Sequence, residues 1–140
     1  MVEDGGTRIA RRFIEAIPLA KALEMRLVRV GDGAVEIAMP WAAALAGDSQ
    51  SGVIHGGAVS ALLDTACGAA VMSRPDRPAT TATLDLRIEH LRHATPGQEL
   101  RAVATCRHVT PRIIFVGAHA WDDDEAQPFA TATGAFTHGS

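Results

Sequence analysis

A single acid lies within an otherwise apolar helical segment of this chain. The segment opens with HGGAVSALLD from His55 to Asp64, and small or apolar residues continue to Met72. A run of this length and composition predicts one long helix over residues 56–72. Residues at intervals of four, three and four share one face of that helix, namely Gly57, Ala61, Asp64 and Gly68. Because the other three are small, a ligand or a second backbone can approach the Asp64 carboxylate closely.

Two glycines mark the start of the same helix. The first backbone N–H groups of a helix have no intrahelical acceptor and form the positive end of its dipole. Gly56 and Gly57 carry no Cβ, so a substrate can come close to these donors. Donors of this kind stabilise an oxyanion where negative charge develops. Taken alone, a glycine pair is more often a turn, and a histidine such as His55 is more often a cap. The combination with Asp64 favours an acyl-transfer site.

The composition is that of an ordinary globular protein. The chain has 140 residues, of which 47% are hydrophobic and 21% are charged, and its net charge is −3. Because binding to a phosphate backbone needs a cationic surface, this balance disfavours a nucleic-acid partner. Cys67 and Cys106 lie in apolar stretches without CxxC spacing, which favours a reducing compartment. The sequence shows no apolar signal region and no membrane-spanning run, so we expect a cytoplasmic protein without membrane partners.

Strand patterns fill most of the remaining sequence. A helical segment at about residues 7–24, interrupted by a proline, comes first. Segments with strand character are separated by polar turns: 25–30, 34–41, 81–92, 99–109, 113–121 and 129–138. In the second, Val35, Ile37 and Met39 alternate with Glu36 and an alanine, the period of a half-buried strand. The order predicts a single α+β domain, residues 1–140, with an antiparallel sheet around one central helix.

The helix motif and the strand that follows it resemble a known family. HGGxxxxLLD on a helix of small residues, followed by TLDLRIEHLRHATPG, is similar to the acyl-CoA thioesterases of the hotdog fold. The resemblance is to the phenylacetate-pathway and hydroxybenzoyl-CoA type, and it extends from about Leu23 to His138. It implies a sheet wrapped around one long helix, and an enzyme that hydrolyses acyl-CoA to a free acid and coenzyme A.

The resemblance also implies roles for individual residues. Asp64 would be the catalytic carboxylate, as nucleophile or as general base. The Gly57 N–H would polarise the thioester carbonyl, with His55 beside it. The implied substrate-binding residues are Gly56, Ser49, Gln50, Thr83, His90, Arg92 and Arg112. Of these, His90 and Arg92 would line the coenzyme A path, and Arg112 would meet the coenzyme A phosphates.

The chain departs from the family pattern around the acid. Relatives place Asn or Gln six residues before the histidine to hold a water molecule, whereas Ser49 occupies that position here and Gln50 follows it. One turn after the acid some relatives carry Ser or Thr, and this chain has Gly68. Thr83 falls where relatives have a hydroxyl near the water, although strand alternation places it on the polar face.

The family resemblance implies a homodimer, arranged as a dimer of dimers, whose sites each take the acid and the glycine from different subunits. It implies no metal, and no cofactor apart from coenzyme A as part of the substrate. The alternative function is a non-catalytic acyl-CoA-binding or regulatory hotdog module, with a dehydratase ranked below it. A metal site at Glu89, His90 and His93 is disfavoured because neighbours on a strand face opposite ways. Cys67 is disfavoured as a nucleophile because no basic residue lies near it in sequence.

Overall fold

The computed structural model describes residues 4–31 and 33–138. Its helices are α1 (Gly5–Ala16), α2 (Pro18–Ala22) and α3 (Gly56–Met72), with a 3-10 turn η1 (Ala43–Leu45). Its strands are β1 (Arg26–Gly31), β2 (Ala34–Met39), β3 (Thr83–His90), β4 (Leu100–Val109), β5 (Ile113–Trp121) and β6 (Ala130–Thr137). The predicted helix 56–72 and the break at the proline are confirmed. The predicted turn residue Asp32 and the ends of the predicted domain, 1–3 and 139–140, lie outside the described residues.

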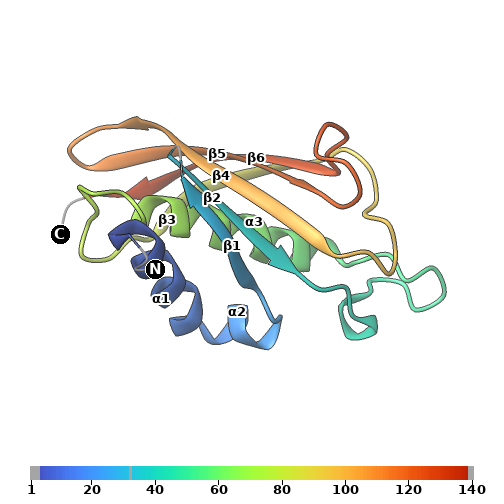
Figure 1. Ribbon diagram of the computed structural model, residues 1–140. Helices are drawn as coiled ribbons and strands as arrows, with labels where there is room; N and C mark the ends of the chain where they lie inside the picture. Colours follow the sequence, from blue (N-terminus) through green and yellow to red (C-terminus); the bar gives the residue numbers. More distant parts are fainter. Residues whose placement is uncertain (1–3, 32, 139–140) are drawn as a thin grey trace.

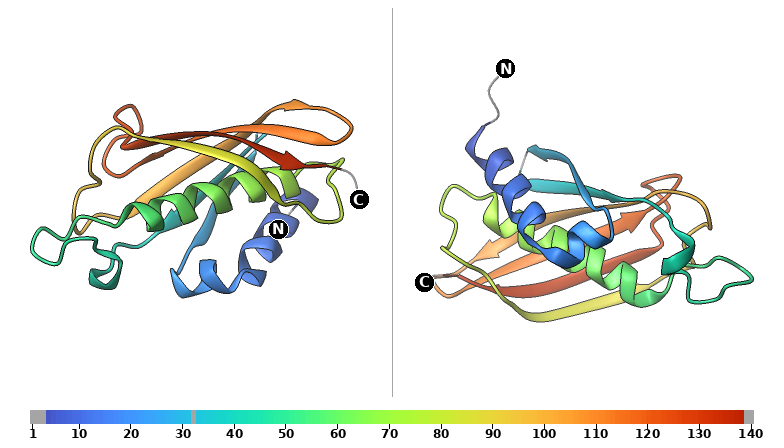
Figure 2. Two further views of the ribbon diagram at one scale, coloured as in Figure 1. Left: turned by 180° about the vertical axis from the view of Figure 1, so that it is seen from behind. Right: turned by 90° about the horizontal axis from the view of Figure 1, so that it is seen from below.

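All the strands form one antiparallel sheet in the order β1-β2-β4-β5-β6-β3. The sheet curves around α3, which contacts β2 to β6 on the concave side (Figure 1). The two N-terminal helices lie on the same side, and α1 packs against both α3 and β1 (Figure 2). The predicted α+β arrangement is therefore confirmed. Within the described chain, every helix is too short or too polar to cross a membrane.

Helix α3 is buried through small side chains. Its buried positions are Val59, Leu62, Leu63, Ala66, Cys67, Gly68, Ala69, Ala70 and Val71. Alanine, cysteine and glycine keep the helix thin, so the curved sheet can pack closely against it. At Gly68 a side chain also arrives from α1, because a Cβ built there would lie 2.9 Å from Phe13 Cζ. The small-residue face was expected to admit a second subunit, but at Gly68 that space is filled by Phe13 of the same chain.

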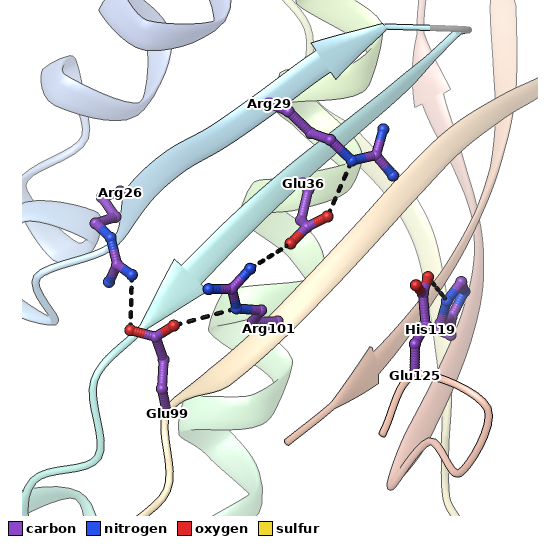
Figure 3. A network of polar contacts seen from close by, with 7 residues as sticks. All are labelled: Arg26, Arg29, Glu36, Glu99, Arg101, His119 and Glu125. Atoms are coloured by element: carbon purple, nitrogen blue, oxygen red, sulfur yellow. Dashed lines mark hydrogen bonds and ion pairs between the residues drawn. The ribbon is translucent and has the colours of Figure 1, made fainter. Parts of the chain in front are cut away.

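The convex face of the sheet carries a chain of ion pairs (Figure 3). Glu36 on β2 lies between Arg29 and Arg101, each at 3.0 Å. Glu99 continues the chain, with Arg101 at 3.1 Å and Arg26 at 2.7 Å. Glu36 is only 6% exposed, so both faces of β2 are buried. The prediction of a half-buried strand was wrong here, because paired arginines rather than solvent meet the polar face of β2.

His138 ties the end of β6 to two loops. Its Nδ1 lies 2.9 Å from the carbonyl oxygen of Thr110, and its Nε2 lies 3.1 Å from that of Asp76. Carbonyl oxygens only accept, so both ring nitrogens donate and the protonated imidazole is favoured. These two contacts, the one with Thr110 above all, raise the pKa of His138. The ring therefore joins β6, the β4–β5 turn and the loop after α3.

We expect the contribution of His138 to stability to be lost at alkaline pH. A pKa that is raised on folding gives a stabilisation that is complete below the unfolded value, about 6.5, and that disappears as the pH rises through the folded value. The His138→Gln variant should therefore melt below the wild type at about pH 5.5 and close to it at about pH 9. Thermal unfolding at both pH values tests this, with His108→Gln as the control for an exposed histidine. A Tm difference that does not change with pH would contradict it.

Candidate active site

The N-terminus of α3 is capped by His55. The Nδ1 of His55 accepts a hydrogen bond from the Gly57 N–H at 2.8 Å, and its carbonyl oxygen accepts from the Ala58 N–H at 3.0 Å. A ring nitrogen that accepts belongs to a neutral imidazole, whose proton is then on Nε2. The Gly57 N–H, which the resemblance assigns to the thioester carbonyl, therefore already has an acceptor in the free chain. Within the described residues, the Gly56 N–H has none.

Two cavities meet at His55, which lines both of them. The larger, of ≈ 540 Å³, lies between residues 47–56 and 90–94 and reaches Phe129. The other, of ≈ 370 Å³, lies between α2 and residues 44–46 and runs along α3 from Gly57 to Ala61. The start of α3 is therefore accessible from two sides, which suits a ligand with two dissimilar ends.

His90 lies beside the same helix start. A Cβ built on Gly56 would lie 3.7 Å from His90 Cε1, and both residues line the larger cavity. The structure thus brings three of the predicted residues together: His55, Gly56 and His90. Their closeness depends on the end of β3 passing the N-terminus of α3, which sequence spacing alone does not reveal.

Arg92 also lines the larger cavity, but it is engaged within the chain. Its guanidinium donates to both Asp122 carboxylate oxygens, at 2.7 and 3.1 Å, and to the carbonyl oxygens of Gln127 at 2.8 Å and His93 at 3.0 Å. The Asp122 side chain is 1% exposed, and this guanidinium holds the pKa of Asp122 well below its usual range. Arg92 therefore joins the loops after β3 and β5, and coenzyme A would have to compete with these contacts.

Asp64 is held by a threonine from the edge strand. The Thr83 Oγ1 donates to Asp64 Oδ1 at 2.7 Å. Strict alternation with Leu86 and Ile88, which pack against the core, would turn Thr83 away from α3. The pairing of β3 with β6 shifts between Thr83 and Asp85, and such a bulge reverses the direction of the side chains. The expectation that Thr83 lies on the outer face is therefore corrected.

Gly134 on β6 makes room for this bulge. A Cβ built on Gly134 would lie 2.8 Å from the Asp85 carbonyl oxygen and 2.9 Å from Leu86 Cδ1. Distances this short would force β3 away from β6. A glycine inside a strand is typical of a bulge or a close backbone approach. The glycine of ATATGAFT was therefore a signal in the sequence for an irregular strand pairing, although it does not name the partner strand.

The cavity around Asp64 is small and mostly apolar. Its volume is ≈ 160 Å³, and its other lining residues are Phe13, Ile17, Leu19, Ala61, Thr65, Gly68, Thr81, Thr83 and Phe136. Asp64 is half-buried and carries the one ionisable side chain in this described lining. Its Oδ2 has no hydrogen-bond partner among the described residues. A carboxylate held through one oxygen can use the other to deprotonate water or to attack a carbonyl carbon.

Asp64 and Gly57 cannot act on one carbonyl group within a single chain. They lie seven positions apart on α3, which is about 10.5 Å along the helix axis. A reacting carbonyl has to lie about 3 Å from the donor that stabilises its oxygen. Each chain therefore presents two half-sites: an N-terminal half-site (His55, Gly56 and Gly57) and an acid half-site (Asp64 and Thr83).

Three predicted substrate residues lie outside both half-sites and line none of the cavities described above. Ser49 and Gln50 are exposed in a turn and line none of these cavities. Their neighbours Asp48 and Ser51, which are not among the predicted substrate residues, line the larger cavity instead. Arg112 is exposed in the β4–β5 turn, at the end of the sheet beside the loop after α3.

Cys67 is closed off from any substrate. It is fully buried on α3, and this burial raises the pKa of its thiol to about 12. The thiol therefore stays protonated at neutral pH, and a protonated thiol is a poor nucleophile. Burial, and not the lack of a basic neighbour in sequence, is what disfavours Cys67 as a nucleophile in the structure. In residues 4–31 and 33–138, no three His, Cys, Asp or Glu side chains are placed to hold a metal ion.

We expect the His55→Ala variant to lower the free energy of unfolding by about 0.5–2 kcal/mol, the usual cost of removing a side-chain N-cap. His55→Asn should keep the stability of the wild type, because an amide oxygen can accept from the Gly57 N–H. Urea unfolding of the three proteins measures the difference. Equal stability of the alanine and asparagine variants would contradict a capping role.

Comparison with known proteins adds a family to this geometry. The model of the thioesterase superfamily matches residues 51–129, more than half of the chain and the part that contains both half-sites. A curated protein of Halobacterium salinarum, named provisionally as an esterase, is 30% identical over 94 residues, or 65% of this chain. The chain spans 62% of the length of that relative.

Several solved structures share the fold over almost the whole chain. A Pseudomonas aeruginosa protein is 34% identical with a TM-score of 0.86, over 95% of this chain and 98% of that one. A thioesterase family protein from Silicibacter pomeroyi is 26% identical with a TM-score of 0.83, over 95% and 97%. The E. coli PaaI protein from the phenylacetic acid degradation operon is 22% identical with a TM-score of 0.83, over 95% and 92%, which shows a common fold. Motif, fold and relatives agree that this chain belongs to the thioesterase superfamily and has the hotdog fold.

Proposed function

We propose that the protein hydrolyses acyl-CoA thioesters to a free acid and coenzyme A. Membership of the thioesterase superfamily supports thioester hydrolysis in general. The observation that carries the proposal is the Asp64 carboxylate, which Thr83 orients at 2.7 Å in a cavity whose described lining contains no cation. Partly burying a carboxylate without a cation is costly. A module that only binds acyl-CoA would have no use for it.

Either of two chemical routes uses this carboxylate. As a general base, Asp64 Oδ2 takes a proton from a water molecule whose oxygen attacks the thioester carbon. As a nucleophile, Oδ2 attacks that carbon itself, and water then hydrolyses the resulting anhydride. In both routes the carbon–sulfur bond breaks and the coenzyme A thiolate leaves. The hydrogen bond from Thr83 to Oδ1 keeps Oδ2 directed into the cavity.

The N-terminal half-site supplies the donors for the oxyanion. The thioester oxygen can replace His55 Nδ1 as the acceptor of the Gly57 N–H once the imidazole turns aside. The Gly56 N–H adds a second donor, and the helix dipole favours negative charge at this end. One such donor is worth about 10²–10³ in rate in other acyl-transfer enzymes. His55 thus caps α3 in the free protein and lies beside the thioester in the complex.

A complete site requires two chains. Positions 57 and 64 are equally far from the midpoint between Ser60 and Ala61 on α3. Two antiparallel α3 helices, related by a twofold axis near that midpoint, therefore place Asp64 of each chain beside Gly57 of the other. The edge strand β3 next to Asp64 is unpaired on its outer side and exposes Leu84. We infer a homodimer with two composite sites, and its assembly into a dimer of dimers stays a prediction.

The nucleotide end of coenzyme A needs a free cation. The guanidinium of Arg112 is exposed and makes no hydrogen bond within the described residues. Arg92, in contrast, is occupied by Asp122. Contact of Arg112 with the phosphates therefore stays a prediction, and Arg92 acts by keeping the loops beside the larger cavity in place.

Replacing Asp64 by Asn should lower kcat by about 10²–10⁴-fold, the usual range for a group that transfers the proton. The amide keeps the shape of the side chain and can still contact Thr83, so the variant should fold normally. Thiol release from a panel of aryl- and alkyl-CoA thioesters gives the rate, and circular dichroism checks the fold. Asp85→Asn removes the same charge from β3 and should leave kcat unchanged. A folded Asp64→Asn protein with most of its activity would exclude the catalytic role and favour the binding module.

Mixing two inactive variants should restore activity if each site is shared between chains. One variant carries Asp64→Asn, and the other carries Gly57→Pro, which removes the backbone N–H and must first be shown to fold. In a mixed dimer, one site combines the intact Asp64 with the intact Gly57, while the second site has both defects. About half of the dimers are mixed after random exchange, so roughly a quarter of wild-type activity should return. If subunit exchange is confirmed and no activity returns, Asp64 and Gly57 of one site belong to the same chain.

A further inference from the structure

We propose that Phe13 on α1 sets the depth of the acyl pocket and so decides which acyl groups are hydrolysed. The inference rests on the proposed function, because it assumes that the reacting carbonyl lies at Asp64. It concerns a helix that precedes the HGG motif by some forty residues and lies outside residues 51–129, the part matched by the superfamily. Phe13 would be a specificity-determining residue that contacts the acyl group and not the reacting atoms.

The geometry places Phe13 at one end of the cavity that holds Asp64. Phe13 is half-buried: it lines this cavity, and its ring edge packs on Gly68, one turn beyond Asp64 on α3. Ile17 and Leu19 continue the apolar wall from α1 into α2. The N-terminal helices therefore form an apolar side of this cavity of ≈ 160 Å³, and Thr81 and Thr83 contribute hydroxyl groups to its lining beside β3.

The distribution of polarity indicates which part of the substrate lies here. The side towards α1 offers only apolar contacts from Phe13, Ile17 and Leu19, and no described donor or cation. A pantetheine arm or a phosphate would lose its hydrogen bonds on that side, which is costly. An acyl chain or ring loses nothing there and gains contact. The acyl group therefore points towards α1, and the polar remainder of the substrate leaves in another direction.

Gly68 explains why the ring can reach this position. A Cβ built on Gly68 would lie 2.9 Å from Phe13 Cζ and 3.2 Å from Phe13 Cε2. Any larger residue at this position would push the ring out of its place. Gly68 and Phe13 are thus a matched pair: a phenyl ring from α1 takes the place of the missing side chain on α3 and forms part of the pocket wall.

The test is the ratio of kcat/KM for a long and a short acyl-CoA that differ by two methylene groups. Phe13→Ala removes the ring and lengthens the pocket, so the ratio should rise by about fourfold for each added methylene that gains apolar contact, or about 15-fold for two. Gly68→Ala should push the ring into the pocket and lower the same ratio. In the double variant with Phe13→Ala and Gly68→Ala, the added methyl group meets no ring. The kcat/KM ratio of the double variant should therefore equal that of Phe13→Ala alone.

Ile14→Ala is the matched control. Ile14 is the next residue on α1 and is 3% exposed, but it packs in the core and does not line the Asp64 cavity. It should lower Tm without changing the ratio. If Phe13→Ala fails to fold, Phe13→Leu shortens the side chain with less loss of packing and should shift the ratio in the same direction by a smaller factor.

The outcomes separate the two proposals. A wild-type protein that hydrolyses no acyl-CoA would remove the proposed function and this inference with it. An active wild type whose ratio is unchanged in Phe13→Ala would overturn the inference alone and leave Phe13 with a packing role. Equal shifts in Phe13→Ala and Ile14→Ala would overturn it as well, because a general loosening of α1 would then explain both. A higher kcat/KM ratio in Phe13→Ala, a lower ratio in Gly68→Ala and an unchanged ratio in Ile14→Ala would support the inference.

Discussion

Helix α3 is held between two surfaces, the concave face of the sheet and the helix α1. Small residues bring its inner side close to the sheet, and Gly68 receives Phe13 on the other side. This packing positions both half-sites, because one rigid helix carries the capped N-terminus and the acid. The same rigidity keeps Gly57 and Asp64 about 10.5 Å apart. On the proposed mechanism, a second chain is therefore part of the catalytic apparatus and does more than stabilise the fold.

The direction of the acid depends on the edge of the sheet as well as on the helix. Thr83 reaches Asp64 only because β3 contains a bulge, and β3 can approach β6 there only because Gly134 has no side chain. A local irregularity in the backbone thus places a hydroxyl where a regular strand would have placed it outside. Bulges often serve in this way to redirect a side chain beside a functional site. The edge position of β3 also leaves this region accessible to a second subunit.

The ion pairs of the described residues lie away from the Asp64 cavity. Arginines and carboxylates on the convex face and in the loops form ion pairs, among them Arg92 with the buried Asp122 and Arg101 with Glu36. The described lining of the Asp64 cavity contains no cation. A cation beside a carboxylate favours its charged form and weakens it as a base. Thr83 orients Asp64 through one hydrogen bond to Oδ1, and no cation of the described lining stands against the other carboxylate oxygen.

The sequence by itself determined the elements and the chemistry of the helix. Hydrophobic periodicity and turn residues are local signals, so α3, the strands and the N-terminal helices followed from it, as did the acid and the glycines on one face of α3. Only the tertiary structure decided what lies opposite each residue. The Phe13 ring packs against Gly68, and arginine side chains cover the Glu36 carboxylate. Asp122 forms an ion pair with Arg92, and the bulge turns Thr83 towards Asp64. These contacts join residues distant in sequence or depend on a one-residue shift in register, and alternation and spacing carry no information about either.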